Sequence, residues 1–337
     1  MSGAELLNLL HRADVRPVLV DIGSSGAGHA AWDPIASASV GIGFDPDARE
    51  PDRAFAERFH RAITVDKAVT TDDITDEVEF YLTAYPYCSS ILEPDMEALS
   101  DYIFRDLFKV ERRVRAGATS LNRVIDELAL PAIDWLKVDA QGLDLAVIKS
   151  LSAENFARVL AIDIEPGLVN AYKGEALFGA LHQHLLDSGF WLSSFAYQAY
   201  PRVHPESVDE IAALVNLPEA DVRAQLRSSP TAAEARYLRS AAWLDRAHAG
   251  KRDYVLLFVF AVIERQNGFA FDVLKSYRTR FGSDAVGDAM SELVRTMFKK
   301  VPASAPASGL IAQIRRRIGT LLRALGLLQP RDAPGRA

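Results

Sequence analysis

A glycine-rich turn and an acidic residue on either side of it carry the clearest chemistry in this sequence. A short apolar run ends in Asp21, and three glycines follow, Gly23, Gly26 and Gly28. A buried strand that breaks into such a turn lets the backbone approach a ligand closely, and the helix start that follows favours polar or anionic groups. Asp45 ends the next apolar run, where a carboxylate can accept hydrogen bonds from a ribose. These residues predict a site for a nucleotide-type cofactor.

Two cofactors fit this turn. From Gly26, the letters GAGHAA match the dinucleotide pattern G-x-G-x-x-A, and Asp45 lies near the separation that the pattern requires. The order VDIGSSG is instead typical of S-adenosylmethionine sites, in which Asp21 ends the strand and the Gly23–Gly26 backbone wraps an amino-acid-like group. The turn by itself leaves both cofactors open.

The elements that must position these residues alternate along the chain. Apolar runs with strand character occur at residues 17–23, 39–45, 62–69, 133–140, 160–165 and 189–197. Between them lie segments whose apolar residues are three or four apart, which is the helical period. Strands that alternate with helices predict a parallel sheet covered on both faces, so the expected fold class is α/β.

Beyond residue 200 the sequence predicts helices and one last strand. Residues 201–250 have a helical pattern throughout, including an alanine-rich stretch after Pro230, and we expect them to form a helical cap. The apolar run at 251–264 is predicted to be the final core strand, antiparallel to the run at 189–197. A cap that follows a parallel strand leaves the sheet at its carboxyl edge, where ligands bind in α/β folds. Helices near 269–281 and 284–300 form a predicted extension over 265–301.

The C-terminal residues differ in character from the rest. Residues 302–309 predict a flexible linker, and residues 310–337 a basic amphipathic tail with its apolar residues on one helical face. Such a helix suits an anionic membrane surface at the inner face of the membrane. Its packing on this protein or on a partner helix is the alternative.

Composition limits the compartment and the partners. The net charge of −7 argues against a general nucleic-acid binder. The single cysteine, Cys88, excludes an internal disulfide framework and fits a reducing compartment. The N-terminal residues lack the apolar core of a signal peptide, and nowhere do enough apolar residues run together to span a membrane. We therefore expect a cytoplasmic protein.

The segment Ile133–Leu151, IDWLKVDAQGLDLAVIKSL, resembles the central motif of the FkbM family of S-adenosylmethionine-dependent methyltransferases. Other landmarks of the family follow in its order, namely the VDIGSSG turn, FDP, KAV, Ser89–Ser90, and Tyr172–Lys173–Gly174 after Glu165. The resemblance covers about residues 16 to 198. It implies that residues 1–200 form a Rossmann-like methyltransferase core, whose seventh strand would be the run at 251–264. Asp45 and Asp144 stand where the family usually has glutamate, which leaves the contact made by the shorter Asp144 open.

The resemblance also implies a reaction, methyl transfer from S-adenosylmethionine to a hydroxyl of a sugar, a polyketide or a lipid-linked acceptor. The residues expected to bind the cofactor are Asp21, Gly23, Ser24, Gly26 and Asp45. A base must take the proton of the acceptor; Asp139 is the first candidate and Glu165 the second, and the alternative for each is to cap a neighbouring helix. Asp163 and Glu165 share a strand face, but no further residues have the spacing of metal ligands. We therefore expect no metal ion.

Two other functions remain open on this sequence. A nicotinamide-dependent (NAD) oxidoreductase would use the same kind of sheet and the same turn. A methyltransferase-like protein without activity could instead serve as a scaffold in the assembly of cell-surface glycans. The expected partner is a small-molecule or glycan acceptor, and the oligomeric state is not predicted.

Overall fold

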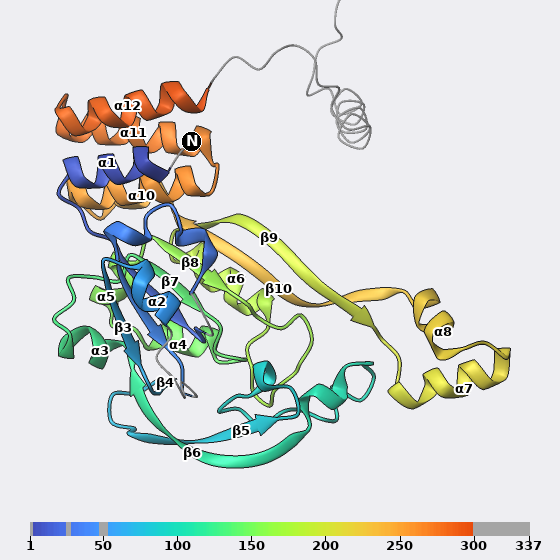
Figure 1. Ribbon diagram of the computed structural model, residues 1–337. Coiled ribbons are helices and arrows are strands. Elements are labelled where there is room, and N and C mark those ends of the chain that lie inside the picture. Colours follow the sequence, from blue (N-terminus) through green and yellow to red (C-terminus); the bar gives the residue numbers. More distant parts are fainter. Residues whose placement is uncertain (1–2, 25–27, 47–52, 299–337) are drawn as a thin grey trace, which may run out of the picture. The chain divides into compact units, whose positions relative to one another are not determined.

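Seven strands form the central sheet of the computed structural model, which describes residues 3–24, 28–46 and 53–298 (Figure 1). Their order is β3-β2-β1-β7-β8-β10-β9, and every pairing is parallel except those that β10 makes with β8 and β9. The strands are β1 (Val18–Ile22), β2 (Val40–Phe44), β3 (Arg61–Val65), β7 (Trp135–Val138), β8 (Ala161–Ile164), β9 (Phe190–Pro201) and β10 (Ser228–Arg239). The predicted α/β class with a Rossmann-like, seven-stranded sheet is confirmed.

A second, smaller sheet of three strands was not predicted from the sequence. It has the order β4-β6-β5, with β4 (Ala68–Thr70), β5 (Glu77–Thr83) and β6 (Val110–Ser120). The apolar run predicted as one strand at 62–69 is therefore divided between β3 of the central sheet and β4 of the small one. In Figure 1, β5 and β6 run along the lower side of the molecule.

Helices cover both faces of the central sheet, and apolar side chains of its inner strands pack against them on each face. β1, β2 and β8 are buried along their whole length, as expected for a sheet packed on two sides. One core cluster joins these strands to α3 (Leu121–Glu127), α4 (Asp144–Ser150) and α6 (Phe178–Asp187). The other is built on α1 (Gly3–Arg12), α10 (Lys251–Ile263), α11 (Asn267–Phe281) and α12 (Ala285–Met297). Shorter helices are α2 (Arg53–Arg58), α5 (Ala153–Arg158) and α9 (Ala241–Arg246).

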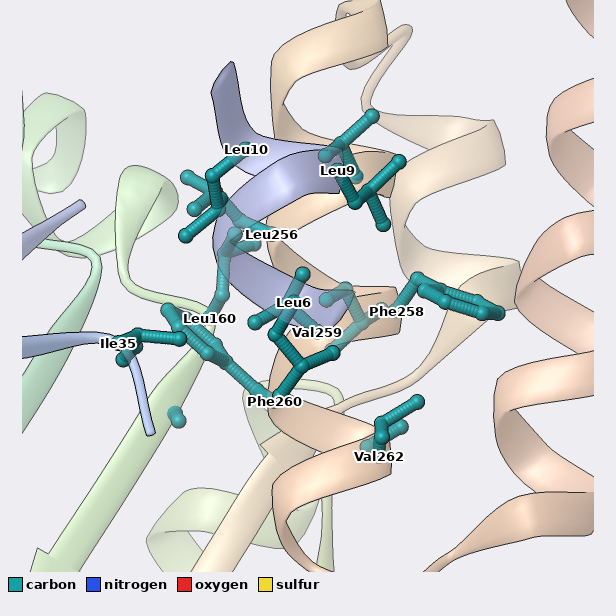
Figure 2. Close-up of a cluster of buried hydrophobic side chains, with 14 of the residues drawn as sticks. Leu6, Leu9, Leu10, Ile35, Leu160, Leu256, Phe258, Val259, Phe260 and Val262 are labelled. Carbon is teal, nitrogen blue, oxygen red and sulfur yellow. The ribbon is translucent and has the colours of Figure 1, made fainter. Parts of the chain in front are cut away.

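The first helix of the chain packs against one of the last. Figure 2 shows Leu6, Leu9 and Leu10 of α1 beside side chains of α10. Phe260 of α10 in turn meets Trp135 of β7, with ring centroids 4.8 Å apart. The helices at both ends of the described chain thus share one core with the centre of the sheet.

The predicted final strand at 251–264 is wrong, because residues 251–263 form helix α10. All residues from Tyr254 to Val262 are buried. An apolar run without polar interruptions has neither the helical nor the strand period, so it cannot distinguish a buried strand from a buried helix. The start of the helix is fixed locally, since the Asp253 carboxylate accepts a hydrogen bond of 2.9 Å from the Gly250 N–H.

The seventh strand is β10, which lies inside the predicted helical cap at 201–250. Its buried positions alternate, with Thr231, Ala233, Ala235 and Tyr237 inside. This period of two is a strand signal, but the alanine-rich composition favoured a helix. The helical part of the region is limited to α7 (Pro205–Val215), α8 (Glu219–Gln225) and α9. α7 and α8 form the tip between β9 and β10, on the right of Figure 1.

The predicted helices near 269–281 and 284–300 correspond to α11 and α12. No helix in the described part of the chain is long and apolar enough to cross a membrane. The predicted linker at 302–309 and the predicted tail at 310–337 lie outside the described residues.

Candidate functional site

A cavity of about 320 Å³ lies at the carboxyl edge of the central sheet. Gly23, Asp45 and Asp139, which follow β1, β2 and β7, form its wall on the side of that sheet. The small sheet also lines it, through residues such as Phe80 of β5 and Arg112 of β6, and so do residues of the segment 86–91 and Gln141. The cavity therefore brings together three of the site residues that the sequence predicted, from three different strands.

Gly23 lies where the turn after β1 touches the end of β7. Its φ angle is +78°, and a Cβ atom there would lie 2.5 Å from the carbonyl oxygen of Asp139. The N–H groups of Gly23 and Ser24 both donate to the carbonyl of Phe44, at 3.1 Å. Only glycine combines this backbone conformation with so close an approach. Ser24 lies against Gly43 of β2 and does not line the cavity, and Gly26 is outside the described residues.

Beneath the cavity, four charged residues form a row across the sheet, which we call the charge ladder. Asp21, Lys137, Asp163 and Arg236 are register neighbours on β1, β7, β8 and β10. Their signs alternate, and the ion pairs include Lys137 Nζ to Asp21 Oδ1 at 3.4 Å and Arg236 to Asp163. Burial raises the pKa of Asp21, while the Lys137 charge opposes this shift.

Two residues considered from the sequence, Asp21 and Asp163, belong to the charge ladder and do not line the cavity. The carboxyl group of Asp21 is 2% exposed and faces Lys137. Asp163, considered above as a metal ligand, accepts hydrogen bonds from Arg236 and from Trp135 Nε1, the latter at 2.5 Å. Among the residues that the structure describes, no group of three or more histidine, cysteine or acidic side chains is arranged to hold a metal ion.

Two residues further along the same strands lies a second row, which we call the carboxylate row. Asp139, Glu165 and Glu234 adjoin the paired positions Val138, Ile164 and Ala235, so they are neighbours across β7, β8 and β10. This row contains three acids and no cation of its own. Lys137 of the charge ladder reaches up to it, with Nζ 3.8 Å from Asp139 Oδ2 and 3.6 Å from Glu165 Oε1.

The carboxylate row is only partly neutralised, and the pKa values of Asp139 and Glu165 are raised. Burial raises the pKa of Asp139, against the opposing effects of the Lys137 charge and a hydrogen bond from Gln141. Burial, followed by the charge of Asp139, raises the pKa of Glu165 to about 7. The charge of Glu234 adds to both shifts. Carboxyl groups whose pKa values are close to neutral pH are suited to general acid–base chemistry.

Several residues of this site were not assigned a role from the sequence. Lys137 precedes Asp139 by two positions and Asp163 precedes Glu165 by two, so the strand period already placed each pair on one face. Gln141 and Tyr172 were noted only as parts of the family motif. Glu234 could not be found, because the segment that contains it was predicted to be a helix.

The family model of the methyltransferase FkbM domain matches residues 33–192. No curated protein and no solved structure gives a significant match to the chain. The matched region contains Asp45, Asp139 and Glu165, whereas the turn after β1 precedes it and β10 follows it. Residues 33–192 thus match the FkbM methyltransferase domain, and the recognition made from the central motif is confirmed.

Proposed function

We propose that this FkbM domain transfers a methyl group from S-adenosylmethionine to a hydroxyl group of its acceptor. The observation that carries the proposal is the cavity at the carboxyl edge, where Gly23 of the preceding turn meets Asp45 and Asp139 of the matched region. Its volume is in the range of small-molecule sites. Bound there, the cofactor supplies an electrophilic methyl group on a sulfonium.

The residues of the cavity suit this cofactor. The cradle at Gly23 leaves no room for a side chain, so the backbone of the turn itself can approach the amino-acid part of the ligand. Asp45, at the end of β2, is positioned to accept hydrogen bonds from the ribose.

Asp139 is our candidate for the base, with Glu165 beside it. The cofactor would supply a methyl carbon whose bond to the sulfonium sulfur breaks as the acceptor oxygen bonds to it, which releases the demethylated product, and the proton of that oxygen would pass to a carboxylate of the carboxylate row. Lys137 holds that carboxylate in place, since its Nζ lies within 4 Å of both acids. The two carboxyl groups titrate as a pair because each charge acts on the other. The acceptor class within sugars, polyketides and lipid-linked alcohols stays a prediction.

Calorimetry against S-adenosylmethionine, its demethylated product and NAD tests the cofactor. We expect the first two to bind and NAD not to bind. Asp45→Ala should weaken binding of S-adenosylmethionine by about 1–3 kcal/mol, because the ribose loses its acceptor. Asp126→Ala, an exposed aspartate on α3, is the matched control and should bind normally.

The other possible results of the calorimetry would contradict the proposal in different ways. Unchanged affinity in Asp45→Ala would contradict the ribose assignment. Binding of NAD without S-adenosylmethionine would favour the oxidoreductase, and binding of neither would favour a scaffold without activity.

A further inference from the structure

Asp139 is tied to two neighbours, Gln141 and Tyr172, by a chain of short contacts. Gln141 Nε2 lies 2.6 Å from Asp139 Oδ1. Tyr172 Oη lies 2.9 Å from Gln141 Oε1 and also 2.9 Å from the backbone carbonyl oxygen of Cys88. Tyr172 is 4% exposed, so no bulk water replaces these partners.

The number of protons that Asp139, Gln141 and Tyr172 can donate limits how these contacts are arranged. A tyrosine hydroxyl has one proton, so Tyr172 can donate to Gln141 or to the Cys88 carbonyl, but not to both. If it donates to Gln141 Oε1, the amide NH₂ points at Asp139 Oδ1, which accepts. A proton on Asp139 would then have to lie on Oδ2, which faces the Lys137 ammonium at 3.8 Å, so this arrangement favours the carboxylate. If it donates to Cys88, it can accept from the amide NH₂, which turns Oε1 toward Asp139. In that case Asp139 must be protonated, because an amide oxygen only accepts.

The two arrangements correspond to Asp139 before and after it takes a proton. We propose that Gln141 and Tyr172 act as positioning residues, a relay whose amide and hydroxyl reorient so that Asp139 is hydrogen-bonded in both of its protonation states. This inference rests on the proposed function, in which the acceptor's proton passes to Asp139. The acidic O–H of Asp139 then donates to Gln141, the amide to Tyr172, and Tyr172 to Cys88, so that no polar group loses its partner.

The backbone around Gln141 holds the relay in place. Gln141 has a φ angle of +48°, which is unusual for a residue with a side chain, and Gly142 follows with +97°. A Cβ atom at Gly142 would lie 3.0 Å from the ring of Tyr172. On its other side, the Tyr172 ring packs against Phe108, with centroids 5.6 Å apart. Uncommon backbone conformations of this kind persist where the surrounding structure requires them, often at functional sites.

Other charged groups around Asp139 affect its titration and must be considered with the relay. Lys137 lies below it, and Glu165 and Glu234 lie beside it on β8 and β10. Asp21 of β1 and Asp144 of α4 also feel its charge. Burial raises the pKa of Tyr172 well above its usual value, so Tyr172 itself stays neutral across the range in which Asp139 titrates.

The test is a pH titration of protein labelled with ¹³C at the tyrosine Cζ and at the aspartate carboxyl carbon, over the whole pH range in which the protein stays folded. The Tyr172 signal is assigned by its loss in Tyr172→Phe. We expect it to shift with the same midpoint as the Asp139 carboxyl signal, and to become insensitive to pH in Gln141→Met. Tyr277, a buried tyrosine that donates to Asp284, is an internal control and should not follow that midpoint.

A Tyr172 signal that does not shift in the unmodified protein would overturn the relay. A shift that persists in Gln141→Met would also overturn it, since Asp139, or Glu175 that accepts from the Tyr172 N–H, would then act on Tyr172 without the amide. The titration needs neither cofactor nor acceptor, so its failure is distinct from failure to bind S-adenosylmethionine. In the transfer assay, Gln141→Met should lower kcat roughly three- to tenfold.

Discussion

Asp144 shows how a single side chain of this site can reduce stability. It begins α4 and is 2% exposed, and burial raises its pKa from an ordinary 3.8 to about 7. Between these two values the folded protein keeps the proton that the unfolded chain has lost. Stability is therefore complete below about pH 4 and decreases as the pH rises to about 7, by a total on the order of 4 kcal/mol.

Asp144→Asn removes this titration, so it should stabilise the protein at neutral pH and above. We expect the melting temperature of the variant to exceed that of the unmodified protein at pH 8 and to equal it near pH 4. Thermal unfolding at both pH values measures this. Asp126→Asn on the surface of α3 is the control and should change neither value. A variant less stable at pH 8 would mean that the Asp144 carboxylate has a stabilising partner.

At the scale of single residues, the sequence predicted those parts of the site that come directly after a strand. Gly23, Asp45 and Asp139 each follow an apolar run, and parallel strands bring such positions to one edge. The side-chain direction of Asp21 was not predictable, because it depends on Lys137 in a strand that lies more than 100 residues away in sequence. Glu234 and Tyr172 are likewise far from Asp139 in sequence and come near it only in the folded protein.

At the scale of elements, α10 and β10 exchange the roles that their compositions predicted. α10 is rich in valine and aromatic residues, which favour strands, yet it is a helix buried on all sides. β10 contains alanines and charged residues, which favour helices, yet it pairs along its length with β9. Tertiary packing overrides the composition of both segments. The position of α10 against the sheet, for example, requires an element without a polar face.

The tip formed by α7 and α8 is our candidate for acceptor recognition. β9 and β10 pair as far as Pro201 and Ser228, so the tip projects from the carboxyl edge of the sheet. It contacts the rest of the protein through exposed ion pairs such as Arg105–Glu206, which contribute little to stability. Replacing residues 202–227 with a short Gly/Ser turn should preserve the melting temperature and the affinity for S-adenosylmethionine, but abolish transfer to the native acceptor.

Calorimetry and a transfer assay on the shortened protein separate the outcomes. Full activity would show that the tip has no part in recognising the acceptor. Removal of the whole of 201–250 is the matched contrast and should unfold the protein, because that region includes β10, the partner of both β8 and β9.

At the scale of the whole molecule, the open question is the basic tail at 310–337, which lies outside the described residues. We propose that it binds anionic membranes, since its charges before Asp332 are all basic and its apolar residues recur in the sequence at a spacing of three or four. The full-length protein should sediment with phosphatidylserine-containing vesicles, less so at high salt, and a chain ending at Val301 should not. Phosphatidylcholine vesicles are the control. Equal sedimentation of both chains, or of neither, would contradict the proposal.

The packing of α1 against α10 has a consequence for the synthesis of this protein. α1 ends at Arg12 and α10 begins at Lys251, so the ribosome adds about 240 residues before the partner of the first helix exists. At roughly 5–20 residues per second, this takes on the order of 10 to 50 seconds. During that interval Leu6, Leu9 and Leu10 lack the α10 side chains that cover them in the folded protein, so the apolar face of α1 stays incompletely buried until α10 has been made.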